Sequence, residues 1–185
     1  MTEGDERKAV EAVLRGERAA YAVLVDRYKD RVFNLAYRMT GRYGDADDLT
    51  QEAFIRAYLN LGRFDRDRSF FTWLYTIALN VVRNHLKKRS RDIIDGAETW
   101  EDGRNAGGPG EGTPESALGD RQEQERLQAC LLGLSVETRE AVVLRFYEDL
   151  SFEETAAVLG ISESAAKMRV YRGLDRLKGL MTEQD

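Results

Sequence analysis

The sequence has little cysteine, histidine and proline. Cys130 is the one cysteine and His85 the one histidine among 185 residues. An intrachain disulfide needs two cysteines, and a Cys/His zinc site needs more cysteine and histidine ligands than this chain has. Both kinds of site are therefore excluded. No run approaches the roughly 18 consecutive apolar residues that span a bilayer, and the N-terminus lacks the basic-then-apolar order of a secretory signal. We therefore expect a soluble cytoplasmic chain with no membrane insertion, no metal and no cofactor.

Both prolines of the chain fall in one glycine-rich stretch, residues 102–120. Large apolar side chains are almost absent from it, so burial cannot offset the entropy that ordering would cost. We therefore predict a flexible acidic linker at residues 92–122. It would join two small helical domains, residues 1–91 and residues 123–185.

The net charge of −5 is unevenly distributed along the chain. Residues 1–91 carry +5, residues 92–125 carry −8 and residues 126–185 carry −2. Sequence-independent affinity for DNA comes mainly from the neutralisation of phosphates. A chain with this net charge should therefore bind duplex DNA weakly on its own.

Helical periodicity runs through the N-terminal domain. Apolar residues recur at helical spacing from Tyr21 to Met39, and Gly41 is placed to end that helix. The stretch GDADDLTQEAFIRAYLNLGRF predicts a second helix, whose buried face would hold Ala46, Leu49, Ala53 and Ala57.

Three acidic residues, Asp45, Asp47 and Asp48, lie in the first turn of this second helix. Carboxylates interact favourably with the positive end of a helix. Three neighbouring carboxylates are also compatible with a metal or acid–base site. Since they have no partner histidine, we favour the helix start as the explanation.

Residues 69–91, SFFTWLYTIALNVVRNHLKKRSR, predict a third helix with an apolar stripe and a polar face. Side chains three, four and seven positions apart share a helix face. Those of the polar face are Asn80, Arg83, Asn84 and Lys87. Amides can pair with base edges and cations with phosphates, so this face is a candidate for nucleic-acid binding.

Aromatic residues gather around the start of the third helix, at Phe64, Phe70, Phe71, Trp73 and Tyr75. Aromatic platforms beside a positive groove hold the bases of single-stranded nucleic acids. Phe70 and Trp73 also lie on the apolar stripe, so a place in the core is the alternative for both.

The segment LSFEETAAVLGISESAAKMRVYRGLDRLK, residues 150–178, predicts two helices joined at a glycine. Ser151 and Glu154 form a capping box for the first helix. Gly160 can adopt the left-handed conformation that the turn requires. The second helix would be capped by Ser162 or Ser164 and would bury Ala166, Val170, Leu174 and Leu177.

The second helix of this pair leaves a polar and cationic face outward. Its members are Ser164, Lys167, Met168, Tyr171 and Arg172, with Arg169 at the edge. A tight helix–glycine–helix of this kind is typical of a helix-turn-helix that reads DNA. A purely structural helical hairpin is the alternative.

Together these stretches resemble the extracytoplasmic-function (ECF) group of bacterial RNA polymerase sigma factors. DADDLTQEAFIRAY and FTWLYTIALNVVRNHL resemble sigma region 2, and LSFEETAAVLGISESAAKMRVYRG resembles region 4. The resemblance covers residues 17–91 and 123–180, in the same order. It implies an all-α fold with two small helical domains, a region 2 bundle and a region 4 helix-turn-helix.

The resemblance also implies a role for each matching position. The surface that binds the clamp helices of the largest polymerase subunit aligns with Asp48, Gln51, Glu52 and Phe54. The segment that captures a non-template base and reads the minus-ten element aligns with Phe64, Ser69, Phe70, Asn80, Arg83, Asn84 and Lys87. The readers of the minus-thirty-five element align with Ser164, Lys167, Met168, Arg169, Tyr171 and Arg172.

Two positions depart from the pattern of the family. A β-branched residue usually stands in the place of Ala166, so the core should be lighter there. Met168 stands where a small polar residue is common, which puts hydrogen-bonded readout in doubt and leaves contact with a thymine methyl.

The resemblance implies a specificity subunit without a catalytic site of its own. Its partners would be core RNA polymerase, promoter DNA and an anti-sigma factor. Two alternatives from other classes are a transcriptional regulator that binds duplex DNA alone, often as a dimer on palindromes, and an enzyme that uses the three aspartates with a metal.

Cys130 lies at helical spacing with Leu127, Leu131 and Leu134. We therefore predict that it belongs to the core and is not a redox sensor.

Overall fold

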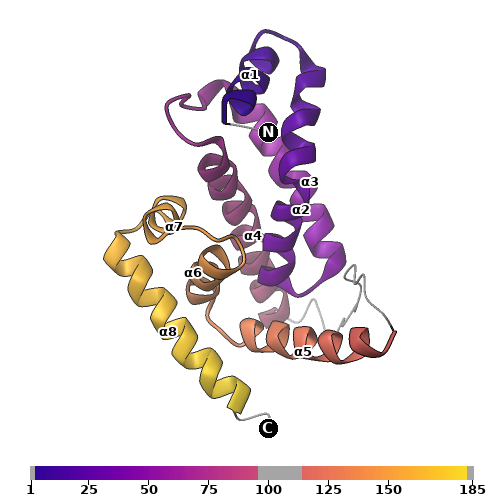
Figure 1. Ribbon diagram of the computed structural model, residues 1–185, viewed down its shortest axis with the longest axis vertical. Coiled ribbons are helices and arrows are strands. Elements are labelled where there is room, and N and C mark those ends of the chain that lie inside the picture. Colours follow the sequence, from indigo (N-terminus) through magenta and orange to yellow (C-terminus); the bar gives the residue numbers. More distant parts are fainter. Residues whose placement is uncertain (1–2, 96–113, 183–185) are drawn as a thin grey trace.

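The computed structural model describes residues 3–95 and 114–182, and every regular element in these ranges is helical (Figure 1). This confirms the predicted all-α fold class. None of the described helices is both long and apolar enough to cross a membrane. In chain order the elements are α1 (Glu3–Leu14), η1 (Arg18–Ala20), α2 (Tyr21–Thr40), α3 (Tyr43–Asn60), η2 (Leu61–Arg63), α4 (Phe70–Ile94), α5 (Pro114–Leu132), α6 (Val136–Phe146), α7 (Phe152–Leu159) and α8 (Glu163–Thr182).

Helices α2, α3 and α4 pack against one another and form the N-terminal bundle, with α1 packed against α2 near one end (Figure 1). The left-handed Gly41, with φ +71°, ends α2 as predicted. Small residues on the buried face of α3 allow its backbone to approach its neighbours closely. This face holds Ala46, Leu49, Ala53 and Ala57, as the periodicity predicted.

Helices α7 and α8 form the predicted helix–glycine–helix. The capping box joins Ser151 and Glu154 in both directions, at 3.1 and 2.8 Å. Gly160 adopts the left-handed conformation with φ +67°. Ser162 caps α8, since its hydroxyl accepts a hydrogen bond of 3.3 Å from the backbone N–H of Ala165.

One core prediction for α8 is wrong. Leu174 is exposed, and Gly173 instead lies buried where α8 crosses α6. A Cβ on Gly173 would come within 2.4 Å of Val142 and 2.9 Å of Thr138. The missing side chain therefore lets the two helices approach, and this contact sets which face of α8 turns inward.

Two helices extend into residues 92–122, where the sequence predicts a linker. Helix α4 continues to Ile94, and α5 begins at Pro114. Proline is well tolerated in the first turn of a helix, where its missing N–H would have no partner. Residues 96–113 lie outside the described ranges.

The N-terminal bundle and the C-terminal helices pack directly on one another (Figure 1). Helices α5 and α6 contact α2, and α7 contacts α4. Apolar residues of both halves, such as Leu79 and Leu144, belong to one continuous core cluster. The two domains that the sequence predicts therefore share an interface.

Cys130 is buried, with 1% of its surface exposed. It belongs to a second, smaller cluster that also holds Leu131, Leu134, Val142 and Leu177. The prediction that it is a core residue is confirmed.

We expect Gly173→Ala to lower the free energy of unfolding by about 1–3 kcal/mol, because the new methyl group overpacks the α6–α8 crossing. Gly179→Ala is the matched control, since it lies on the same helix with open space around it. Urea titration would measure both variants. Equal midpoints would contradict this account of the crossing.

Candidate nucleic-acid and polymerase interfaces

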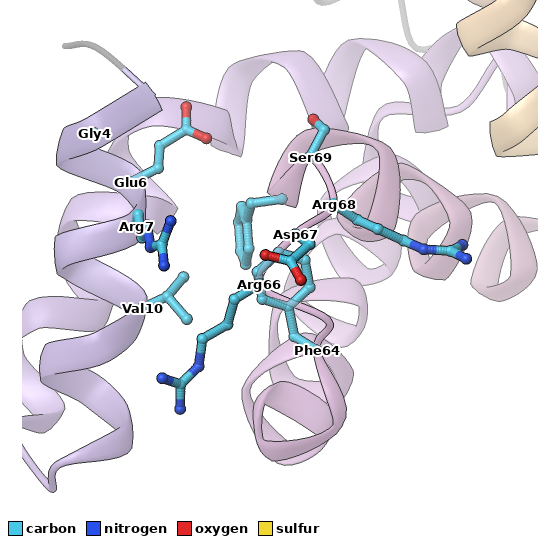
Figure 2. Close-up of a pocket in the computed structure, with 10 residues that line it drawn as sticks. Gly4, Glu6, Arg7, Val10, Phe64, Arg66, Asp67, Arg68 and Ser69 are labelled. Carbon is cyan, nitrogen blue, oxygen red and sulfur yellow. The ribbon is translucent and has the colours of Figure 1, made fainter.

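A cavity of about 410 Å³ lies between α1 and the loop that leads into α4 (Figure 2). Figure 2 shows α1 on one side and the loop on the other, with the side chain of Arg66 between them. Three predicted site residues line the cavity, Phe64, Ser69 and Phe70. The other lining residues are Gly4, Glu6, Arg7, Val10, Arg66, Asp67 and Arg68.

Aromatic rings form one wall of this cavity. The rings of Phe64 and Phe70 meet edge to face with centroids 5.6 Å apart, and Phe64 lies 5.1 Å from Trp73. Phe70 is buried and also contacts the ring of Tyr28. Phe64 is only half-buried. Phe70 therefore belongs to the core and supports Phe64, which offers the more accessible ring.

Ser69 has a structural task as well as a place in the cavity. Its side chain accepts a hydrogen bond from the backbone N–H of Thr72 at 3.4 Å and caps α4. The cap fixes the point at which the loop becomes helix. It thereby holds the loop residues of the cavity in a defined position relative to α4.

Three arginines surround the cavity, and sequence reasoning did not select them. Arg7 pairs with Glu11 at 3.3 Å and Arg68 with Asp65 at 3.4 Å, both at the surface. Arg66 makes no ion pair within the described part of the chain. Exposed pairs contribute only about 0–1 kcal/mol, so these cations can turn to an anionic ligand at small cost. The basic loop GRFDRDR was the available signal in the sequence.

Glu6 fastens the α1 wall of the cavity to α2. The Tyr28 hydroxyl donates a hydrogen bond of 2.6 Å to its carboxylate, and Arg27 Nε lies 2.8 Å from the same oxygen. Burial, followed by the contact with Glu6, raises the pKa of Tyr28 well above its usual value. The hydroxyl therefore stays protonated and acts as a donor.

The polar face of α4 is present, but one member is engaged elsewhere. Asn80, Asn84 and Lys87 are exposed. Arg83 donates to Asn80 Oδ1 at 3.2 Å and forms a second, bidentate contact with Glu140 of α6. The predicted minus-ten face is therefore partly covered by the C-terminal domain.

The outward face of α8 agrees with the predicted arrangement. Met168 and Tyr171 are 52% and 59% exposed, although both are largely apolar. Lys167 pairs with Glu163 at 2.8 Å, and the ring of Tyr171 lies 6.2 Å from that of Phe152. The remaining predicted residues are also accessible, with Ser164 and Arg172 exposed and Arg169 half-buried.

The predicted polymerase surface on α3 needs one correction. Asp48 and Gln51 are exposed, and Glu52 is half-buried and pairs with Arg56. Phe54 is buried and its backbone carbonyl accepts a hydrogen bond from Tyr21, so it is a core residue and is not presented to a partner. The exposed apolar side chains beside the polar ones are Ile55, at 59%, and Leu59, at 74%.

Asp45 and Asp47 at the start of α3 have different partners, and Asp48 is exposed. Asp45 accepts from Arg89 at 3.1 Å and lies 3.3 Å from His85, which ties α3 to α4. Asp47 accepts from Gln51. Within the described ranges, no three His, Cys, Asp or Glu side chains form a group that could hold a metal.

Family models agree with this arrangement of two helical units. The model of Sigma-70 region 2 matches residues 24–92, and that of Sigma-70, region 4 matches residues 124–177. The ECF RNA polymerase sigma factor SigW of Bacillus subtilis (strain 168) is 35% identical over 182 residues, covering 93% of this chain and 94% of SigW. The chain belongs to the ECF sigma factors. Another relative, the ECF RNA polymerase sigma-E factor of Escherichia coli (strain K12), is 34% identical over 176 residues. The match covers 91% of this chain and 90% of that sigma-E factor.

This ECF sigma factor also resembles the structure of CnrH in complex with the cytosolic domain of CnrY. The TM-score is 0.73 at 26% identity, and the match covers 98% of this chain and 99% of CnrH. Both sigma regions are therefore present in the order of the family, which makes the chain a promoter-directing subunit. Membership also accounts for the region 2 stretches that a two-domain regulator would leave unexplained.

We expect Tyr28→Phe to lower the free energy of unfolding by about 1–2 kcal/mol, because the buried Glu6 carboxylate loses a donor. Tyr43→Phe removes the same atom from an exposed residue and should change stability by less than about 0.5 kcal/mol. Urea unfolding of the two variants gives the comparison. A Tyr28→Phe variant as stable as Tyr43→Phe would contradict the role of Glu6 in fastening α1.

Proposed function

We propose that this sigma factor captures one unstacked base of the minus-ten element in the cavity between α1 and the α4 loop. The observation that carries the proposal is the cavity itself, with an accessible aromatic ring, a hydroxyl and three surrounding arginines. Its volume of about 410 Å³ lies in the range of small-ligand sites. It suits a single nucleotide, whereas a duplex would need a groove.

Capture of a base costs a few kcal/mol of unstacking. Contact with the ring of Phe64 can return about 1–3 kcal/mol of this cost, as base–aromatic stacking does elsewhere. Arg7 and Arg66 line the cavity and would pair with the flanking phosphates, and Ser69 and Asp67, which also line it, would supply polar atoms to the base. Asn80, Arg83, Asn84 and Lys87 would contact the strand as it continues along α4.

The minus-thirty-five element would be read by α8 in the major groove. Lys167, Arg169 and Arg172 supply cations for phosphates and guanine edges, and Ser164 supplies a hydroxyl. Met168 and Tyr171 supply apolar contact for thymine methyl groups. Met168 and Tyr171 lie three positions apart on one face of α8, so such contacts would cover the exposed surface of both side chains.

Core polymerase would bind α3 through Asp48, Gln51 and Glu52, with Ile55 and Leu59 as the apolar part of the same surface. This combination fits an interface with an apolar centre and a polar rim. Polymerase would also tether both DNA-reading units. The effective concentration that results compensates for the weak duplex affinity of a chain with net charge −5.

In this proposal the chain contributes choice of sequence and no covalent chemistry of its own. It would work in the cytoplasm, where polymerase and promoter DNA are found. An anti-sigma factor is a further expected partner, as the resemblance to the family implies, and the similar CnrH structure holds that protein together with a second protein, the cytosolic domain of CnrY.

Run-off transcription with purified core polymerase and a library of random promoters tests the proposal. Product that appears only with this protein, from sequences that share two spaced elements, is the expected result. Absence of product, combined with tight binding of duplex DNA by the protein alone, would instead favour a transcriptional regulator that acts without being a polymerase subunit.

Arg172→Ala should weaken transcription about tenfold on promoters with the selected upstream element, since a good base contact is worth about 1–3 kcal/mol. The same promoters with that element scrambled are the control. An equal loss on both sets would show that Arg172 does not read the element.

The double variant Asn80→Ala and Asn84→Ala should change which downstream bases are enriched in the random-promoter assay. The reason is that amide side chains discriminate between base edges, whereas cations mainly bind phosphates. Lys87→Ala should lower the yield from all sequences similarly. Unchanged enrichment in the asparagine variant would refute base reading by this face.

A further inference from the structure

Five charged and polar side chains meet where the C-terminal domain covers the N-terminal bundle. We call them the interdomain polar cluster: Arg31 of α2, Tyr75 and Arg83 of α4, Glu140 of α6, and Glu148 of the α6–α7 turn. The cluster consists of two groups. Each group places a carboxylate of the C-terminal domain on donors of the N-terminal bundle.

The first group is a bidentate pair between Arg83 and Glu140. Arg83 Nε donates to Oε1 of Glu140 at 2.5 Å and Nη2 donates to Oε2 at 2.7 Å. Glu140 is fully buried, while the side chain of Arg83 is 34% exposed. The hydrogen bonds to Glu140 raise the pKa of Arg83 above its usual value. This parallel two-bond geometry is the one by which arginine also recognises phosphate.

The second group surrounds Glu148. Arg31 donates through Nε to its carboxylate and through Nη2 to its backbone carbonyl, each at 3.1 Å. Tyr75, which is fully buried, donates its hydroxyl to the same carboxylate. Burial raises the pKa of the Glu148 carboxyl, and the contacts with Tyr75 and Arg31 act in the opposite direction. The hydrogen bonds that Arg31 and Tyr75 donate to Glu148 exist only while the two domains are in contact.

We propose that the Arg83–Glu140 pair is an autoinhibitory contact, in which Glu140 takes the place of a DNA phosphate on the minus-ten face. Arg83 cannot hold the carboxylate and the DNA strand in the same bidentate geometry. The closed arrangement therefore covers a residue that the proposed function assigns to DNA binding, and to that extent the inference rests on the proposed function.

The coupling between closure and DNA binding acts in both directions. Arg83 is free to bind DNA only in the open form. The apparent affinity for DNA is then the affinity of the open form multiplied by the fraction of molecules that are open. By linkage, DNA that occupies Arg83 favours separation of the domains by the same factor. When the domains separate, water can reach the carboxylates of Glu140 and Glu148 and hydrate them.

The first test measures the distance between the domains in the free full-length chain. Spin labels would be attached to Ala22→Cys on α2 and Asp175→Cys on α8, both exposed positions. Cys130 is buried and stays unlabelled in the folded chain. Glu140→Gln should shift the distance distribution towards longer values relative to the parent. Glu153→Gln, an exposed residue of the same domain, is the matched control and should leave it unchanged.

The second test measures binding of single-stranded DNA of random sequence, which probes the phosphate contact and needs no knowledge of the promoter. Glu140→Gln should bind this DNA about tenfold more tightly than the wild type, the least that loss of charge-assisted hydrogen bonds is expected to give. Adding Arg83→Gln to Glu140→Gln should remove the gain. Glu153→Gln should bind as the wild type does.

Circular dichroism would establish that each variant folds. If Glu140→Gln does not fold, Arg31→Gln replaces it, because that side chain is 45% exposed and lies outside the proposed DNA surface. An unchanged distance distribution in the folded variant would overturn the closed contact. A longer distance without tighter DNA binding would overturn autoinhibition. Transcription by the wild type decides the proposed function separately, since the distance measurement uses neither polymerase nor DNA.

Discussion

Buried charges between the two domains must be paired, and this constraint decides how region 4 lies on region 2. A carboxylate removed from water loses several kcal/mol of hydration unless donors replace it. Glu140 is satisfied by Arg83, and Glu148 by Arg31 and Tyr75. In both cases the donors belong to the other domain. The C-terminal helices therefore fit the bundle in one register, because a displaced register would leave buried carboxylates without partners.

The end of α2 is subject to the same requirement. The last carbonyls of a helix have no partner within the helix. Gln128 of α5 donates to the carbonyls of Tyr37 and Arg38, and Arg139 of α6 donates to that of Met39. Because α2 also contributes Arg31, it is the element through which the two domains are joined. In this closed arrangement, these contacts position α4 and α8, which carry the proposed DNA-binding faces, relative to each other.

Local features of the sequence predicted most of the secondary structure, and three residues that the resemblance selected, Phe64, Ser69 and Phe70, line one cavity. The capping box at Ser151 and the turn at Gly160 depend on neighbouring residues, so they could be predicted from the sequence. Periodicity placed Leu174 in the core and the resemblance placed Phe54 on the polymerase surface, whereas the structure exposes Leu174 and buries Phe54. Two adjacent helical positions differ by about 100° around the axis, and the neighbouring helices decide which of them is covered. The sequence did not predict that α1 forms a wall of the cavity, because α1 is distant from the loop along the chain and meets it only in the folded protein.

The sequence by itself determined the helices, their caps, the family and the residue types available for binding DNA. These properties depend on short-range geometry and on the order of motifs along the chain. Only the tertiary structure decided that Phe70 supports Phe64, that Arg7 faces the same cavity as Arg66, and that Arg83 is held by Glu140. Such pairings join residues distant in the chain, and they follow from the packing of whole helices, which no local pattern specifies.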